Sequence, residues 1–75
     1  MNLSNENQSK NLRLIRRKEV QNKTGFGPSS IYAMMAKGQF PKPIKLSERR
    51  VAWIESEIDQ WIYERIAQHQ AAMEA

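Results

Sequence analysis

Two prolines in the middle of the chain constrain its fold more than any other feature. The segment Phe40-Pro41-Lys42-Pro43 cannot be helical, because proline lacks an amide hydrogen and biases the residue before it toward extended geometry. Extended backbone therefore joins the part before the prolines to the part after them. With 75 residues in total, the chain is expected to form one small domain at most.

The residues before the prolines predict two short helices. Helix-forming residues run from Arg17 to Lys23 and stop at Thr24-Gly25, where a glycine suits a helix C-terminus. Pro28 suits the first position of a second helix, which Gly38 ends. Two short helices joined by a turn containing glycine form the outline of a helix-turn-helix. Their core-facing side chains are predicted to be Val20, Ile31, Met34 and Met35.

The residues after the prolines predict a small β-hairpin. Ile44 and Leu46 alternate with Lys45, and the same alternation recurs from Val51 to Trp53. We expect two short strands joined by the four residues 47–50, with a charged tip. Because a two-stranded hairpin is marginally stable alone, its apolar face is expected to pack against the helices.

The last predicted element is an amphipathic helix over residues 55–68. Apolar side chains recur at i, i+3, i+4 and i+8, and acidic residues stand at its start, where the helix dipole favours negative charge. Trp53 and Trp61 are in phase with the apolar positions, so we expect them in the core and not stacked on bases. The stripe consists of Ile58, Trp61, Ile62 and Ile66.

Together these elements predict a mainly α fold with a small β-hairpin. The expected architecture is a winged helix-turn-helix in the order helix-helix-hairpin-helix. Residues 1–11 are polar with almost nothing to bury, so we expect a disordered N-terminal lead-in. The winged helix-turn-helix domain is predicted to cover residues 12–69, followed by a C-terminal tail over 70–75.

The charge of the chain is strongly asymmetric. Between Lys10 and Arg50, eleven Lys and Arg face two acids, a net charge of +9. From Val51 onward, five acids face one base, a net charge of −4. A basic part joined to an acidic part is typical of a protein that meets a polyanion with one side only. A solvated basic surface without a partner is the alternative.

Several classes of function lack the residues they need. His69 is the single histidine and no cysteine is present, so disulfides, cysteine nucleophiles and typical zinc sites are excluded. No glycine-rich phosphate loop occurs, and we expect no enzyme activity, no cofactor and no metal. The polar N-terminus resembles no signal sequence, and the longest apolar run, 31–36, is far below the ~18 residues of a membrane span. We expect a cytoplasmic protein without membrane insertion.

Double-stranded DNA is the partner that the remaining residues suit. The second helix of a helix-turn-helix presents its N-terminal residues to base edges in the major groove, and a basic hairpin tip can contact phosphates or enter a minor groove. The same serines would also suit any helix start, Tyr32 could pack at the edge of the core, and the tip could be merely solvated. The predicted DNA-binding residues are Ser29, Ser30, Tyr32, Lys37, Lys42, Lys45, Arg49 and Arg50.

From Leu12 to Ile66 the chain resembles the AlpA family of prophage regulators, whose domains are similar to the winged helix-turn-helix of MerR-type activators and phage excisionases. The resemblance implies that Ser29, Ser30 and Tyr32 lie on the DNA-facing helix and that Lys42, Lys45 and Arg49 belong to the wing. The motifs that carry it are Arg13-Leu14-Ile15-Arg16, Lys18-Glu19-Val20, Thr24-Gly25, Ser29-Ser30-Ile31-Tyr32, the run from Gly38 to Leu46, Arg49, Val51-Ala52-Trp53 and the run from Ile58 to Ile62.

The sequence differs from the usual family pattern in its second helix. No Lys or Arg occurs between Pro28 and Ala36, although these residues make the commonest specific contact to guanine. We therefore expect serine, tyrosine and DNA shape to carry more of the discrimination.

We predict that the protein binds double-stranded DNA sequence-specifically and regulates the transcription of bacterial or prophage genes. One alternative is an excisionase-like factor that bends DNA for recombination, and another is a protein-interaction module or antitoxin. The sequence leaves open a homodimer, cooperative binding to repeated sites, and contact with an integrase or RNA polymerase.

Overall fold

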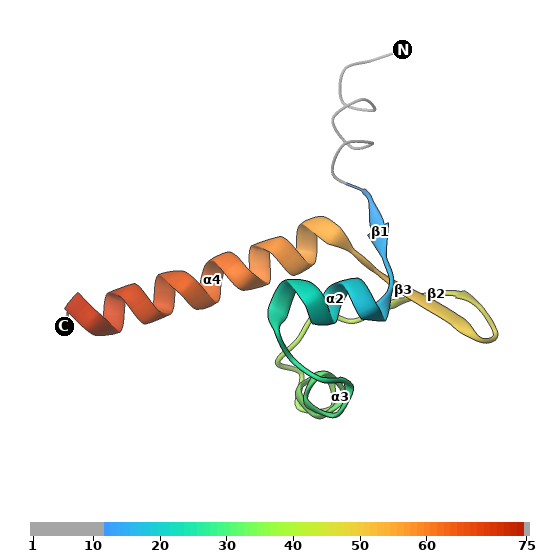
Figure 1. The fold of residues 1–75 in the computed structure, drawn as a ribbon, viewed down its shortest axis with the longest axis horizontal. Helices are drawn as coiled ribbons and strands as arrows, with labels where there is room; N and C mark the ends of the chain where they lie inside the picture. Colours follow the sequence, from blue (N-terminus) through green and yellow to red (C-terminus); the bar gives the residue numbers. More distant parts are fainter. Residues whose placement is uncertain (1–11, 75) are drawn as a thin grey trace, which may run out of the picture.

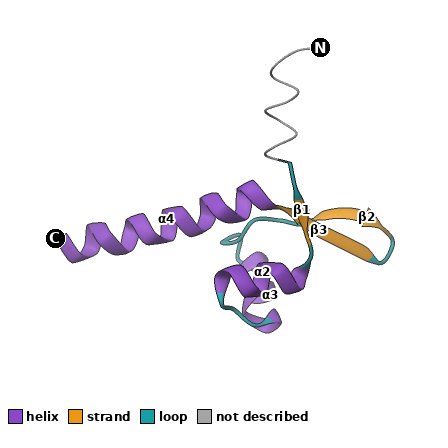
Figure 2. Cartoon of the chain, turned by 45° about the horizontal axis from the view of Figure 1, so that its top comes forward, coloured by secondary structure: helices purple, strands orange, loops and turns teal. Residues whose placement is uncertain are grey.

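The computed structural model describes residues 12–74 and, within that range, contains three helices and a small antiparallel sheet. The protein is mainly helical, with one hairpin as its wing, so the predicted winged helix-turn-helix is confirmed. The hairpin and the C-terminal end of the last helix extend in opposite directions from the body (Figure 1). The elements are β1 (Leu14–Ile15), α2 (Arg17–Thr24), α3 (Pro28–Ala36), β2 (Ile44–Ser47), β3 (Arg50–Ile54) and α4 (Glu55–Glu74) (Figure 2).

The turn between α2 and α3 follows from two glycines and a proline. Gly25 caps α2 in the left-handed conformation, with φ of 81°, and its N–H donates to the carbonyl of Gln21 at 2.7 Å. Gly27 is extended and precedes Pro28, the first residue of α3. Because proline has no N–H that would need a partner there, α3 can begin directly after the turn. The predicted helix-turn-helix outline is therefore correct.

The sheet contains a strand that the sequence did not predict. Leu14 and Ile15 form β1, which pairs antiparallel with β3 in the strand order β1-β3-β2. Ile15 lies opposite Trp53, so both side chains point into the core. A strand of two residues has no alternation that a sequence pattern could reveal.

The hairpin turn is tighter than predicted. Ser47 pairs with Arg50, so only Glu48 and Arg49 form the turn, and the predicted four-residue connection is wrong. Ser47 and Arg50 are polar, so they do not extend the apolar alternation of the strands. The sequence pattern therefore assigns them to the loop. An irregularity between Lys45 and Ser47 shifts the register close to this tip.

Only one strand of the hairpin packs against the helices. Ile44 lies opposite Ala52, so these two side chains share one face of the sheet. Val51 and Trp53 point to the other face. All of β2 is exposed, including Ile44 at 39% and Leu46 at 48%. The expectation of one apolar hairpin face packed on the helices therefore holds for β3 and is wrong for β2.

The core joins every major element except β2. Trp53 and Ile58 are fully buried with Val20 of α2 and Ile31 of α3, as the apolar periodicity predicts. Phe40, in the proline segment, is also buried and stacks edge-on against Trp61, with 4.9 Å between ring centroids. The partly buried residues around this core are Phe26, Met34, Met35, Val51, Trp61 and Ile62.

Helix α4 is longer than predicted. It continues to Glu74, whereas the apolar stripe ends at Ile66 and indicated a helix over 55–68. Residues 67–73 are exposed and rich in alanine and glutamine, which support a helix without burying a face. The predicted disordered lead-in, residues 1–11, lies outside the described residues.

Candidate nucleic-acid interface

An ion-pair cluster connects the start of α4 to the N-terminal elements. Glu55 receives hydrogen bonds from Arg13 at 3.0 Å and from Lys23 at 2.9 Å, and Lys23 also pairs with Asp59. Arg13 approaches Glu19 at 3.5 Å. The acids at the start of α4, which the sequence explained by the helix dipole alone, therefore also hold α2 and β1 against α4.

These contacts shift the titration of two groups. The hydrogen bond from Lys23 is the main reason that the pKa of Glu55 is lowered from 4.5. Hydrogen bonds to Asp59 and then to Glu55 raise the pKa of Lys23 from 10.5. Both groups are therefore charged throughout the neutral range, and the cluster stabilises the fold there.

The cluster also divides the basic residues into two groups. Of the ten Lys and Arg between residues 13 and 50, Arg13 and Lys23 form ion pairs within the described part of the chain. The other eight are exposed at the surface of α2, of the loops and of the hairpin. Among residues 12–50, the positive charge outside these ion pairs comes from Arg16, Arg17, Lys18, Lys37, Lys42, Lys45, Arg49 and Arg50.

A basic cleft of about 390 Å³ lies where the start of α2, α3 and the wing meet. Tyr32 contributes from the exposed side of α3, and Arg49 and Val51 contribute from the wing. Sequence reasoning singled out Tyr32 and Arg49 separately, and the fold brings them to one site. The remaining walls are Arg16, Arg17 and Lys18.

These three basic residues were not among the predicted site residues. They belong to the basic part of the chain, but nothing in the sequence indicates that they border the wing. The strand β1 ends immediately before Arg16, and its pairing with β3 brings the start of α2 to the base of the wing. Because β1 was not predicted, no sequence signal placed these residues next to Arg49.

The other predicted residues on α3 lie outside the cleft. Ser29 and Ser30 are exposed in the first turn of α3, while Ile31 between them and Tyr32 is buried. Lys37 is the C-cap at the far end of the same helix. The exposed surface of α3 therefore carries hydroxyl groups and small side chains, with positive charge only at its C-terminal end.

The predicted wing residues are divided between the two faces of the hairpin. Lys45 lies opposite Val51 and so shares the face that borders the cleft. Arg50 alternates with Val51 and points to the other face, although both neighbouring arginines were predicted for one contact surface. Lys42 is exposed in the extended segment that leads into β2.

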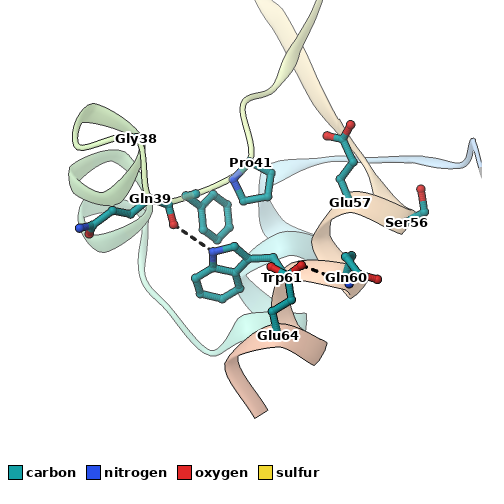
Figure 3. A pocket seen from close by; sticks show the side chains of 9 residues that line it. Gly38, Gln39, Pro41, Ser56, Glu57, Gln60, Trp61 and Glu64 are labelled. Carbon is teal, nitrogen blue, oxygen red and sulfur yellow. Dashed lines mark hydrogen bonds between the residues drawn. The ribbon is translucent and has the colours of Figure 1, made fainter. Parts of the chain in front are cut away.

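A second hollow, of about 530 Å³, differs from the basic cleft in its chemistry. It lies between the 38–41 segment and the first turns of α4, where Glu57 and Glu64 border it (Figure 3). The indole N–H of Trp61 donates to the carbonyl of Gln39 at 2.9 Å across its floor. Its acidic rim would repel a polyanion, so this hollow suits a nucleic acid less well than the basic cleft does.

Other kinds of site have little support in the described residues. Within residues 12–74, no three His, Cys, Asp or Glu side chains are grouped as metal ligands would be. No helix in that range combines the length and apolar character that a bilayer span requires.

Comparison with known proteins identifies the family of this chain. The family described as "Prophage CP4-57 regulatory protein (AlpA)" matches residues 13–66, which include α2, α3, the whole wing and α4 as far as Ile66. The chain belongs to the AlpA family. This confirms the resemblance inferred from the sequence motifs, and the family is one of regulatory proteins and not of enzymes.

Two relatives show how much of the chain the similarity covers. "Uncharacterized protein ORF88" of Enterobacteria phage P4 is 40% identical over 55 residues, which cover 73% of this chain and 62% of that protein. The match thus spans less than two thirds of the phage protein. The "DNA-binding transcriptional activator AlpA" of Escherichia coli (strain K12) is 35% identical over 60 residues, which cover 72% of this chain and 86% of that protein.

Proposed function

We propose that this AlpA-family protein is a sequence-specific regulator of bacterial or prophage transcription that binds double-stranded DNA. The observation that carries the proposal is the basic cleft, where Arg16, Arg17 and Lys18 face Arg49 of the wing beside α3. The similarity to the Escherichia coli transcriptional activator supports it. The acidic α4, with Glu57 and Glu64 around its own hollow, supports a single DNA-facing side.

In the proposed complex, α3 enters the major groove and the wing lies over the adjacent backbone or minor groove. Ser29, Ser30 and Tyr32 are the side chains on α3 that reach base edges or sugars, since they are exposed along its N-terminal half. Their short hydroxyl groups fit a readout that combines few base contacts with DNA shape. This role also explains why α3 can lack Lys and Arg.

The basic residues around α3 position the protein on the phosphates. Arg16, Arg17 and Lys18 contact one strand from the start of α2, while Arg49 and Lys45 contact the backbone on the wing side. Arg50, on the other face of the hairpin, and Lys42 and Lys37, at the edges of α3 and the wing, extend the contact to neighbouring phosphates. The cleft width then sets which groove geometry the protein accepts.

A selection of random duplex DNA by the purified protein tests this function. Binding of the selected duplex is then compared with binding of a scrambled duplex at physiological salt. We expect a short recurring motif and a selected duplex bound at least ~1000-fold more tightly than the scrambled one. Equal affinity for both would show that the protein binds DNA without sequence specificity. Absence of binding would favour a protein partner instead.

A further inference from the structure

The C-terminal half of α4 presents an apolar stripe that the body of this copy leaves uncovered. Tyr63 is 66% exposed, Ile66 51% and Met73 72%. With Gln70, these residues recur at i, i+3, i+7 and i+10, the spacing of the a and d positions in a coiled coil. Their side chains therefore lie along one side of a helix that extends away from the domain (Figure 1).

The charge around this stripe does not suit a nucleic acid. Between residues 60 and 73 the charged side chains are Glu64 and Arg65, which balance each other. The basic cleft involves α2, α3 and the wing, whereas this half of α4 extends from the opposite end of the body (Figure 1). A partner that covers the stripe is therefore itself largely apolar and carries no charge where it meets the stripe.

We propose that the stripe pairs with the same stripe of a second copy of this chain, in an antiparallel arrangement. A two-fold axis midway between Ile66 and Gln70 places Tyr63 of one copy opposite Met73 of the other and Ile66 opposite Gln70, and the symmetry repeats both contacts. Ala67, beside the stripe, has a small side chain that lets the two helices approach closely. The stripe is thus complementary to itself in shape, polarity and charge.

The size of the stripe determines when the pairing occurs. Its 11 residues, from Tyr63 to Met73, span about 16 Å of helix, and three large apolar side chains per copy cover much less than the ~1,600 Å² of a typical stable interface. The free protein is therefore monomeric at low concentration. Two copies bound to neighbouring sites on one duplex raise the effective concentration, and the contact then acts as cooperativity.

This inference rests on the proposed DNA binding, and its first test separates the two. Binding is measured on duplexes that carry one selected site or two inverted sites at varied spacing. On the best spacing we expect the second copy to bind about tenfold more tightly than the first. Met73→Glu removes this gain and leaves single-site affinity unchanged. Equal cooperativity in the parent and in Met73→Glu, or no cooperativity at any spacing in the parent, would overturn the proposal.

Gln68→Glu is the matched control, because it introduces the same charge on the opposite side of α4. It should retain the cooperativity of the parent. If the parent does not bind a duplex with one site, the proposed function is contradicted. The helix pairing is then judged by the second test alone. Circular dichroism of both variants shows whether the helix itself is intact.

The second test needs no DNA. Since the chain contains no cysteine, a single cysteine reports contacts without background. Under mild oxidation at high protein concentration, Gln70→Cys is expected to form a disulfide-linked dimer at least about tenfold faster than Gln68→Cys, because position 70 lies in the interface close to the axis, whereas position 68 lies on the opposite side of α4. Equal rates for the two variants would contradict the antiparallel pairing.

Discussion

The indole nitrogen of Trp53 donates a 3.0 Å hydrogen bond to the carbonyl oxygen of Pro41. Trp61 makes the equivalent bond to the carbonyl of Gln39, two residues earlier. Both acceptors belong to the segment between α3 and the wing, where the prolines prevent regular backbone pairing. Two core tryptophans therefore fix this segment, and through it they set the position of the wing relative to α3.

Substitution of Trp53 should reveal this double role. Trp53→Phe keeps most of the ring but leaves the Pro41 carbonyl without its donor, at a cost of ~1 to 3 kcal/mol. Trp53→Ala also creates a cavity, and we expect a loss of ~3 to 5 kcal/mol. Urea unfolding followed by circular dichroism measures both. A Trp53→Phe variant as stable as the parent would show that the hydrogen bond contributes nothing.

The two glycines of the helix-turn-helix should respond in opposite ways to substitution. Gly25→Ala forces a side chain into a backbone with φ of 81° and should cost ~1 to 2 kcal/mol, although no atom lies within 4 Å of the added carbon. Gly27→Ser provides an oxygen to cap α3, which has no side-chain cap, and should be neutral or stabilising by a few tenths of a kcal/mol. Thermal unfolding compares them. Similar destabilisation by both would contradict the cap assignments.

The ion-pair cluster predicts how stability depends on pH. Because the pKa of Glu55 is lowered in the folded state, its contribution is full above pH 4.5 and is lost as the pH falls through the lowered value. The pKa of Lys23 is raised, so its contribution is full below pH 10.5 and is lost as the pH rises through the raised value. The cluster therefore stabilises the protein across the range between these limits.

Glu55→Gln tests this dependence. The variant should have a lower Tm than the parent at neutral pH, and the difference should shrink as the pH falls below 4.5. Glu57→Gln is the control, since it removes an exposed carboxylate from the same turn of α4 without breaking the cluster. A constant Tm difference for Glu55→Gln across the acid range would mean that the ion pairs do not act in solution.

Periodicity predicted the elements that are long or strongly patterned, and it failed where pairing decides the structure. The stripe from Ile58 to Ile66 and the Gly25 turn are local features, so the sequence alone located α4 and the helix-turn-helix. The strand β1, the register of β2 and the position of Arg16 beside the wing depend on contacts between distant segments. No local pattern contains that information, which is why the basic residues at the start of α2 were not predicted to line the cleft.

Tyr32 is expected to contribute to sequence discrimination. It is 45% exposed on α3 and borders the cleft. In Tyr32→Ala, affinity for the selected duplex should fall about 10- to 100-fold, while affinity for a scrambled duplex stays nearly constant. Tyr63→Ala removes an equally large exposed ring from α4 and should leave single-site binding unchanged. An equal loss on both duplexes would limit Tyr32 to non-specific contact.

The salt dependence of DNA binding tests the central claim, that the basic cleft meets the phosphates, most directly. Arg17→Gln and Gln68→Glu lower the net charge by the same amount, but only the first alters the cleft. We predict that the slope of log affinity against log salt becomes shallower by about 0.9 in Arg17→Gln and keeps its parent value in Gln68→Glu. Parallel lines for the parent and Arg17→Gln would contradict the account.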